Sequence, residues 1–325
     1  MSKTNSEQAA GSQRLSRERL EAWEQLGLGI FLHFGMSTWD GEELSPGTEP
    51  ATTYAPDELD VDSWIKLAAQ AGAKYAVLTS KHVSGFCLWP SAHTDYHVGN
   101  SGNQTDVVAE FCAACERHGL MAGLYYCSWD NHHTFGSLTP SMTAWDDAFT
   151  SAEYHEFQYA QLQELAKRYP GVGEWWIDIP KVLPRHFRDR IYGMLAEATP
   201  DAVIVTNSGI GNGTQFSVAR SWPTDIITIE RYLPPSMDGH KKLREIEGKS
   251  YYLPGEVCDP AGREWFFKPG DTPRSDEELL GMYLVSRARG ANLLLDVGPD
   301  TRGLIPDAFA TSLRRLGENI RKIEG

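Results

Sequence analysis

Carboxylate, imidazole, amide and aromatic side chains end short apolar segments along most of this chain. They are His33, His82, Tyr125, Tyr126, Trp176, Asp178, Asn207, Glu230, Glu256 and Asp296. A pair of carboxyl groups flanking a glycosidic bond is the usual machinery of glycoside hydrolysis. Aromatic rings stack on the apolar faces of sugars, and imidazole nitrogens hydrogen-bond sugar hydroxyls. This set of residue types therefore predicts sugar chemistry carried out by carboxylates.

A metal-dependent hydrolase is the main competing interpretation, and the spacing of histidines and cysteines argues against it. A zinc site needs several nitrogen or sulfur ligands close together, whereas His33 is the only histidine of its segment. His132 and His133 fall in an expected loop, and the Cys112 and Cys115 pair has no partner pair at zinc spacing. Glycine-rich nucleotide-binding motifs are also missing after the first expected strand. We therefore expect neither a metal nor an organic cofactor.

The segments that carry these residues alternate with amphipathic segments, which is typical of βα units around a parallel sheet. The expected strands are residues 29–33, 75–79, 121–127, 174–178, 202–206, 225–229, 250–255 and 292–297. The expected helices are residues 61–70, 106–118, 153–169, 184–198, 275–288 and 306–323. Eight strands within 325 residues predict a closed (β/α)8 TIM-like barrel, in which the C-terminal ends of the strands meet at one mouth. The sixth unit is poorly marked, because residues 232–248 show no long apolar stripe.

Length and composition agree with one folded unit and narrow the classes of partner. We expect a polar N-terminal tail over residues 1–18 and a single α/β domain over residues 19–325. The formal net charge of -14 has the wrong sign for attracting nucleic acid or an anionic membrane surface. No apolar run approaches the roughly 18 residues of a membrane span, and the N-terminus has no apolar export signal. We therefore expect a cytoplasmic protein without nucleic-acid or membrane partners.

Five short segments, in this order and at this spacing, resemble the α-L-fucosidase family of retaining glycoside hydrolases, glycoside hydrolase family 29. They are residues 26–35 (LGLGIFLHFG), 73–89 (AKYAVLTSKHVSGFCLW), 123–126 (GLYY), 175–178 (WWID) and 292–306 (NLLLDVGPDTRGLIP). The catalytic domain of that family is a (β/α)8-like barrel, which agrees with the eight expected strands. Relatives commonly add a C-terminal β-sandwich, and we expect none within this chain.

The resemblance also implies roles for individual carboxylates. Asp178, at the end of the fourth expected strand, matches the catalytic nucleophile of the family. Glu230 is the first choice for the acid/base, because residues 225–230 (DIITIE) resemble the family pattern of an Asp shortly before this Glu. Glu256 is the second choice, and Glu43 resembles another active-site Glu of the family.

Sugar-binding residues and a substrate class follow from the same resemblance. The matching positions are His33, His82, Tyr125 and Trp176, with Trp39, Trp89, Trp129, Arg220 and Trp265 as further candidates. The implied activity is a retaining exo-glycosidase that hydrolyses α-L-fucosides, and the implied partner is a fucosylated oligosaccharide or glycoside.

Several positions depart from the family pattern. Val83 replaces a sugar-binding His, the Arg usually found soon after the fifth strand is missing, and Ile179 and Pro180 stand where a Gly commonly follows the nucleophile. Losing one hydrogen bond to a sugar hydroxyl costs about 0.5–1.5 kcal/mol, which shifts substrate preference without abolishing chemistry. Two alternatives therefore stay open: a catalytically impaired fucose-binding barrel, and a glycosidase for a related sugar such as α-L-galactose.

Overall fold

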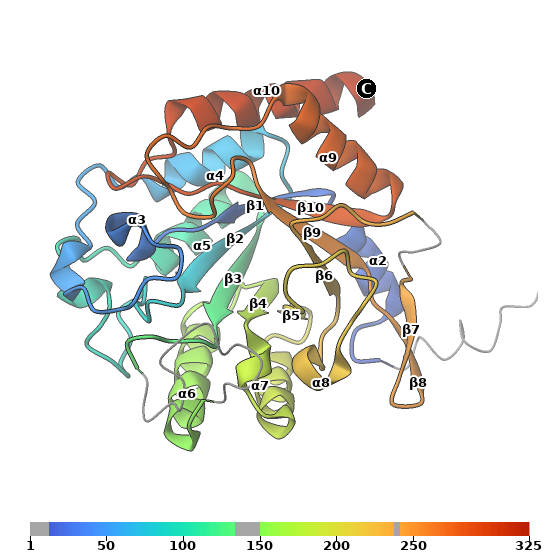
Figure 1. Ribbon diagram of the computed structural model, residues 1–325, viewed down its shortest axis with the longest axis horizontal. Coiled ribbons are helices and arrows are strands. Elements are labelled where there is room, and N and C mark those ends of the chain that lie inside the picture. Colours follow the sequence, from blue (N-terminus) through green and yellow to red (C-terminus); the bar gives the residue numbers. More distant parts are fainter. Residues whose placement is uncertain (1–12, 134–149, 237–240, 325) are drawn as a thin grey trace, which may run out of the picture.

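Eight parallel strands form the centre of the protein. The structure is a computed structural model that describes residues 13–133, 150–236 and 241–324. The strands are β1 (Leu28–Leu32), β2 (Tyr75–Lys81), β3 (Met121–Cys127), β4 (Glu174–Asp178), β5 (Val203–Thr206), β6 (Ile227–Glu230), β9 (Gly255–Pro260) and β10 (Ala291–Asp296). They pair in the order β5-β4-β3-β2-β1-β10-β9-β6, all in parallel. The predicted TIM-like barrel is confirmed (Figure 1).

The barrel closes where β5 meets β6, the two end strands of this order. The amide of Asp225, just before β6, donates to the carbonyl oxygen of Ile204 at 2.8 Å. Farther along β6, Glu230 and Gly211 exchange backbone hydrogen bonds of 3.0 and 3.1 Å. This seam is held by single contacts in place of a continuous ladder, and it lies directly beside the C-terminal end of β6.

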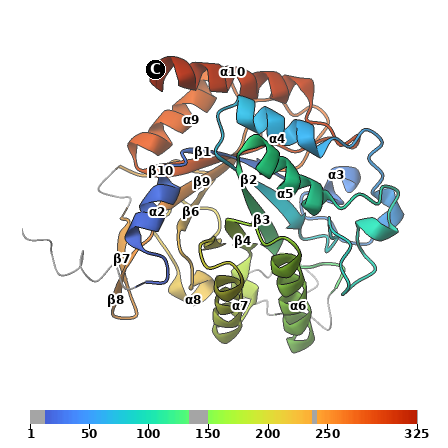
Figure 2. The same cartoon turned by 180° about the vertical axis from the view of Figure 1, so that it is seen from behind.

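Helices surround the barrel, as expected for βα units. They are α2 (Arg17–Glu24), α3 (Ser37–Asp40), α4 (Val61–Gln70), α5 (Val107–His118), α6 (Ala152–Arg168), α7 (Arg185–Ala198), α8 (Val218–Ser221), α9 (Asp276–Ala288) and α10 (Asp307–Glu324). Figures 1 and 2 show α4, α9 and α10 together on one side and α6 and α7 together on another. The six predicted helices agree with α4, α5, α6, α7, α9 and α10 to within one residue at each end.

The prediction for the seventh strand was wrong. Residues 250–255 do not form a barrel strand: β8 (Lys249–Tyr252) pairs with β7 (Leu243–Ile246) as an antiparallel hairpin outside the barrel. The barrel strand β9 begins only at Gly255. The two tyrosines of the hairpin look like a buried strand in sequence, whereas β9 contains Glu, Asp and Pro, which are rare in strands. The first strand of the hairpin and its turn form the end of the poorly marked stretch 232–248.

Part of the expected N-terminal tail contacts the barrel. The Gln13 side chain exchanges hydrogen bonds with the backbone of Tyr252, and Arg14 forms an ion pair with Asp225 beneath the β5/β6 seam. Helix α2 already begins at Arg17, with Ser16 as its N-cap. None of the helices in the described ranges is long and apolar enough to cross a membrane.

Candidate active site

Asp178 ends β4 at the C-terminal mouth of the barrel, where its carboxylate accepts three hydrogen bonds. The Tyr125 hydroxyl donates to Oδ2 at 2.7 Å, and the backbone amide of Ile179 donates to Oδ1 at 2.8 Å. The side-chain amide of Asn207 is the third donor, also to Oδ1 at 2.8 Å. Donors from three successive strands and their ends therefore fix the orientation of this carboxylate.

The amide nitrogen of Asn207 also holds Glu230. Its Nδ2 donates to Glu230 Oε2 at 2.8 Å, the same length as its bond to Asp178 Oδ1. Twice 2.8 Å, or 5.6 Å, is therefore the greatest separation that these two carboxyl oxygens can have. The orientation of the amide is well determined, because Thr228 Oγ1 and the Gly209 amide both donate to Asn207 Oδ1. The two carboxyl groups thus lie side by side at the mouth.

The surroundings of Glu230 favour a protonated carboxyl group near neutral pH. Burial raises the pKa of Glu230 to about 7, and the nearby charge of Asp178 acts in the same direction. The hydrogen bond from Asn207 and the charge of Arg231 lower it in part. A carboxylic acid with a pKa near the working pH is suited to general acid and base catalysis.

The residue after each of these two carboxylates has a left-handed backbone. Ile179 has a φ of 48° and Arg231 a φ of 61°. Among the described residues, the only other non-glycine residue with positive φ is Glu247, in the turn of the β7/β8 hairpin. A β-branched residue is strained in this region, where glycine is not. The departure from Gly at position 179 therefore puts strain next to Asp178, a common feature of functional sites.

Two histidines and a group of rings form the floor beside the carboxylates. Burial lowers the pKa of His33 to about 3, so this imidazole is neutral, and its Nδ1 lies 2.7 Å from Asp296 Oδ1. The Trp265 ring packs 5.1 Å from the His33 ring, and the Phe266 ring packs 4.9 Å from that of His82. His82 Nδ1 is buried without a hydrogen-bond partner among the described residues. An unpaired buried nitrogen of this kind is a ready partner for a ligand hydroxyl.

Glu256 does not lie at the mouth, which corrects the placement expected from sequence. It is the second residue of β9 and is fully buried at the opposite end of the barrel. Tyr75 Oη donates to it at 2.7 Å and Trp176 Nε1 at 2.9 Å, while burial raises its pKa and that of the hydrogen-bonded Glu174. The incorrect seventh strand caused this error, because Glu256 would have ended a strand over 250–255.

Trp176, expected from the sequence to bind sugar, packs behind Tyr125 instead. Its ring stacks on Tyr125 with centroids 5.5 Å apart, and its indole nitrogen is directed toward Glu256, away from the mouth. Since Tyr125 donates to Asp178, Glu256 and Trp176 act on the nucleophile candidate only through Tyr125.

The weaker candidates are spread over different surroundings. Trp89 is fully buried and donates to Glu164, so it belongs to the packed interior. Trp39 is half-buried and packs on Tyr54. Trp129 is buried in the loop after β3. Arg220 is exposed on α8.

Glu43 is an exposed residue of the loop after β1. Partial burial at the mouth nevertheless raises its pKa, with the charge of Asp178 acting in the same direction and that of Arg231 opposing it. Glu43 therefore lies close enough to the paired carboxylates to sense their charge.

Sequence reasoning missed the role of one site residue, Asn207, and did not identify a second, Arg231. Asn207 ends the β5 segment, but nothing in its spacing indicates that it contacts both carboxylates. Arg231 places its guanidinium 4.6 Å from the Trp265 ring centroid and supplies an arginine at the mouth from β6. Its position directly after Glu230 is the only signal that could have suggested it. Val83, the departure from a sugar-binding His, is fully buried in the core.

No group of three or more His, Cys, Asp or Glu side chains suited to a metal ion occurs within residues 13–133, 150–236 and 241–324. The donor set at the mouth is instead a carboxylate pair bridged by an amide, with neutral imidazoles beside it.

Comparisons with known proteins agree with this arrangement. The α-L-fucosidase family model matches residues 48–324. Alpha-L-fucosidase 1 of Arabidopsis thaliana is 29% identical over 312 residues, which cover 91% of this chain and 58% of the plant protein. Plasma alpha-L-fucosidase of Rattus norvegicus is 27% identical over 340 residues, covering 93% of this chain and 69% of the rat protein.

The fold agrees with solved structures as well. The structure of alpha-L-fucosidase isoenzyme 1 from Paenibacillus thiaminolyticus superimposes with a TM-score of 0.77 at 25% identity, covering 94% of this chain and 75% of that one. The chain spans a little over half the length of the plant relatives that it matches. Because the family model covers most of the chain, this protein belongs to the α-L-fucosidase family of glycoside hydrolases.

Proposed function

We propose that this protein is a retaining glycosidase that hydrolyses α-L-fucosides, with Asp178 as the nucleophile and Glu230 as the acid/base. The bridge from Asn207 to both carboxyl groups carries this proposal, since it keeps their oxygens within 5.6 Å of each other. Retaining enzymes have a separation of about 5–5.5 Å, whereas inverting enzymes need about 6.5–9.5 Å to admit a water molecule.

The reaction proceeds in two displacements. An oxygen of Asp178 attacks the anomeric carbon, the glycosidic C–O bond breaks, and Glu230 gives its proton to the departing oxygen. The glycosyl ester of Asp178 is then hydrolysed: Glu230, now a carboxylate, removes a proton from water, whose oxygen attacks the anomeric carbon as the ester bond breaks. Free sugar leaves, Asp178 is a carboxylate again and Glu230 is protonated again.

The floor of the site supports a neutral sugar as substrate. Burial keeps the imidazoles of His33 and His82 uncharged, so they offer hydrogen bonds to hydroxyl groups without a net charge. The rings of Trp265 and Phe266 supply an apolar surface next to them. A 6-deoxy sugar such as fucose combines hydroxyls with an apolar methyl group and matches both features.

Hydrolysis of 4-nitrophenyl α-L-fucoside by wild type, Asp178→Ala and the surface control Asp189→Asn tests the proposal. We expect activity in wild type and control and loss of nearly all activity in Asp178→Ala. Proton NMR of the first product should show retention of anomeric configuration, because two displacements invert the carbon twice. Equal rates in wild type and Asp178→Ala, or an inverted product, would overturn the mechanism.

The same assay separates the two alternatives left open by the sequence. Faster turnover of 4-nitrophenyl α-L-galactoside than of the fucoside would change the substrate to the related sugar. Calorimetric binding of fucose without turnover of either glycoside would indicate the impaired fucose-binding barrel.

A further inference from the structure

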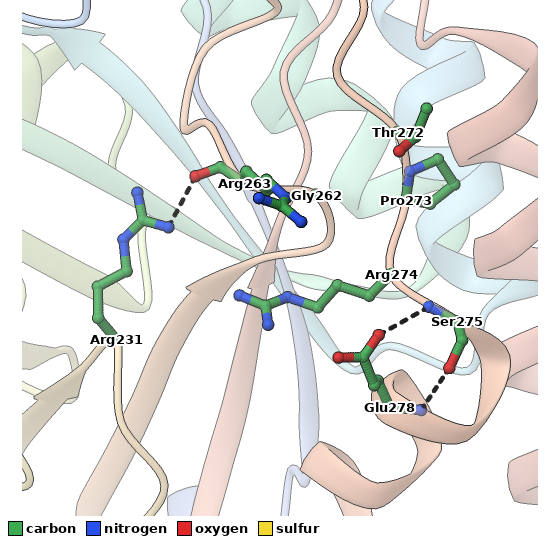
Figure 3. Close-up of a pocket in the computed structure, with 8 residues that line it drawn as sticks. All are labelled: Arg231, Gly262, Arg263, Thr272, Pro273, Arg274, Ser275 and Glu278. Carbon is green, nitrogen blue, oxygen red and sulfur yellow. Dashed lines mark hydrogen bonds between the residues drawn. The ribbon is translucent and has the colours of Figure 1, made fainter.

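A pocket of about 390 Å³ lies beside the mouth, at the ends of β6 and β9. Three arginines line it: Arg231, which follows Glu230, and Arg263 and Arg274 from the connection between β9 and α9. Figure 3 shows the three arginine side chains in one region, with the Arg231 guanidinium next to the Arg263 carbonyl and with Ser275 and Glu278, at the start of α9, beyond Arg274. This volume is within the range of small-ligand sites.

Backbone contacts hold two of these arginines in place and leave donors free. Arg231 Nη1 donates to the carbonyl oxygen of Arg263 at 2.8 Å, and Arg274 Nε donates to that of Pro260 at 3.1 Å. Asp259 lies 3.6 Å from Arg231 and 3.2 Å from Arg274. Each guanidinium has five N–H donors, so most of them have no partner among the described residues. Arginines fixed in this way are organised to receive an anion without further ordering.

The local charge is opposite in sign to that of the whole chain. The formal net charge of the protein is -14, yet the side chains that line the pocket contribute three positive charges against the negative charge of Glu278. Asp259, which pairs with Arg231 and Arg274, offsets a further positive charge and leaves an excess of one. Glu278 accepts from the Ser275 amide as part of the capping box of α9. Barrels of this architecture frequently bind phosphate groups beside the loops after the seventh and eighth strands and a helix N-terminus. The pocket occupies this region, since β9 is the seventh barrel strand.

Arg231 connects the pocket to the carboxylate pair. Its guanidinium lies over the Trp265 ring, which packs on His33, and it follows Glu230 directly. If Glu230 protonates the departing oxygen, the leaving group must lie on the Glu230 side of the bond being broken. The pocket is therefore placed on the leaving-group side of the site, beyond the sugar that is transferred.

We propose that the pocket lined by Arg231, Arg263 and Arg274 binds an anionic substituent, a sulfate ester or a carboxylate, carried by the leaving-group sugar. The assignment of the anion to the leaving-group sugar rests on the proposed function, because the position of the leaving group follows from the role of Glu230. The anion itself is recognised by charge-assisted hydrogen bonds, which do not depend on turnover.

Calorimetry tests the pocket without turnover, using N-acetylglucosamine 6-sulfate and glucuronate as the sulfate and carboxylate probes and N-acetylglucosamine as the neutral one. Wild type should bind at least one anionic probe about tenfold more tightly than the neutral sugar. Arg263→Gln should abolish this difference, because it removes one of the three cationic groups that line the pocket. The Arg263 side chain is exposed, so the variant should still fold. Arg314→Gln, an exposed arginine on α10, is the matched control and should keep the difference. The two anionic probes distinguish sulfate from carboxylate.

Hydrolysis of α-L-fucosyl-(1→3)-N-acetylglucosamine with and without a 6-O-sulfate then tests the link to the reaction. The ratio of kcat/KM for the sulfated over the neutral disaccharide should fall about tenfold in Arg263→Gln and stay constant in Arg314→Gln. Equal probe binding in wild type and Arg263→Gln would overturn the pocket. Anion binding that depends on Arg263, together with no hydrolysis of any fucoside, would instead overturn the proposed function and the assignment to the leaving-group side.

Discussion

At the scale of single residues, the amide of Asn207 defines the geometry of the site. One nitrogen donates to both Asp178 and Glu230, and two further donors fix the amide through its oxygen. The same two carboxylates differ in their surroundings: Asp178 accepts three hydrogen bonds, whereas burial raises the pKa of Glu230 to about 7. Different surroundings for two neighbouring carboxylates are how one site provides both a nucleophile and an acid.

The Glu230→Gln variant tests the acid/base role through the pH dependence of the reaction. Glu230 must carry a proton in the first step, so kcat/KM of wild type should fall as the pH rises through about 7. In Glu230→Gln we expect kcat/KM to drop by about 10²–10⁴ and the alkaline limb to disappear. Glu256→Gln, which removes a buried carboxylate far from the mouth, should retain the limb. A limb that vanished in Glu256→Gln and persisted in Glu230→Gln would reverse the assignment.

The same substitution should stabilise the protein at alkaline pH. The pKa of Glu230 is about 7 in the folded protein and near the ordinary value of 4.5 in the unfolded chain. The stability that its bound proton contributes is therefore fully present below pH 4.5 and lost as the pH rises through about 7. At pH 8, Glu230→Gln should raise the free energy of unfolding by an amount on the order of 2–3 kcal/mol, and at pH 4.5 by almost nothing. Urea unfolding at both pH values measures this, and an equal effect at the two pH values would contradict it.

At the scale of elements, the sequence predicted the position of those strands whose apolar pattern is continuous. β3 and β4 were predicted with their observed bounds, so Tyr125 and Asp178 were placed correctly. β9 was missed because its Glu256 and Asp259 have partners, Tyr75 and Arg274, that only the folded barrel brings to them. The role of Asn207 was likewise out of reach, since it depends on contacts between two strands that meet only when the barrel closes. Local pattern therefore predicted the architecture and the carboxylates, but not the residues that join strands across the seam.

The β5/β6 seam predicts a specific contribution from the N-terminal segment. Arg14 forms an ion pair with Asp225 and donates to the carbonyl oxygens of Pro200 and Ala202, so it holds both sides of the seam. Removing it would leave the buried Asp225 without its cationic partner. We expect Arg14→Gln to lower the free energy of unfolding by about 2–3 kcal/mol.

Arg19 provides the control for this prediction. Among the described residues, its side chain donates to the exposed carbonyl oxygen of Asp201 and to no other group, so Arg19→Gln should change stability by less than about 0.5 kcal/mol. Chemical denaturation of both variants makes the comparison, and similar losses in the two would show that the seam does not depend on Arg14.

At the scale of the whole molecule, the two ends of the barrel differ in how their carboxyl groups are buried. The closed end holds the buried Glu174 and Glu256 pair, and the open end holds the carboxylate pair with apolar residues exposed around it. Ile210 is 71% exposed and Tyr232 53% exposed, and both line a second pocket of about 400 Å³ beside Glu230. An exposed aromatic ring beside the carboxylate pair offers a surface on which a ligand ring can stack. Under the proposed role of Glu230, this rim lies on the leaving-group side of the site.

Tyr232→Ala tests whether this rim binds the leaving group. Loss of stacking on an aryl leaving group should raise KM for 4-nitrophenyl α-L-fucoside about fivefold, with a much smaller effect on kcat, because ring stacking contributes about 0.5–1.5 kcal/mol. Leu284→Ala, an exposed apolar residue on α9, is the control and should leave KM unchanged. An unchanged KM in Tyr232→Ala would remove this residue from the leaving-group site.

The most direct test of the central claim is to trap the covalent intermediate. A 2-fluoro-fucosyl fluoride has a good leaving group and a slowed second step, so the ester on the nucleophile should accumulate and be visible in the intact mass of the protein. Peptide mapping is predicted to place one fluorofucosyl group on Asp178 in wild type and none in Asp178→Ala. A label on another residue, or turnover of fucosides with no label on Asp178, would contradict the double-displacement mechanism proposed here.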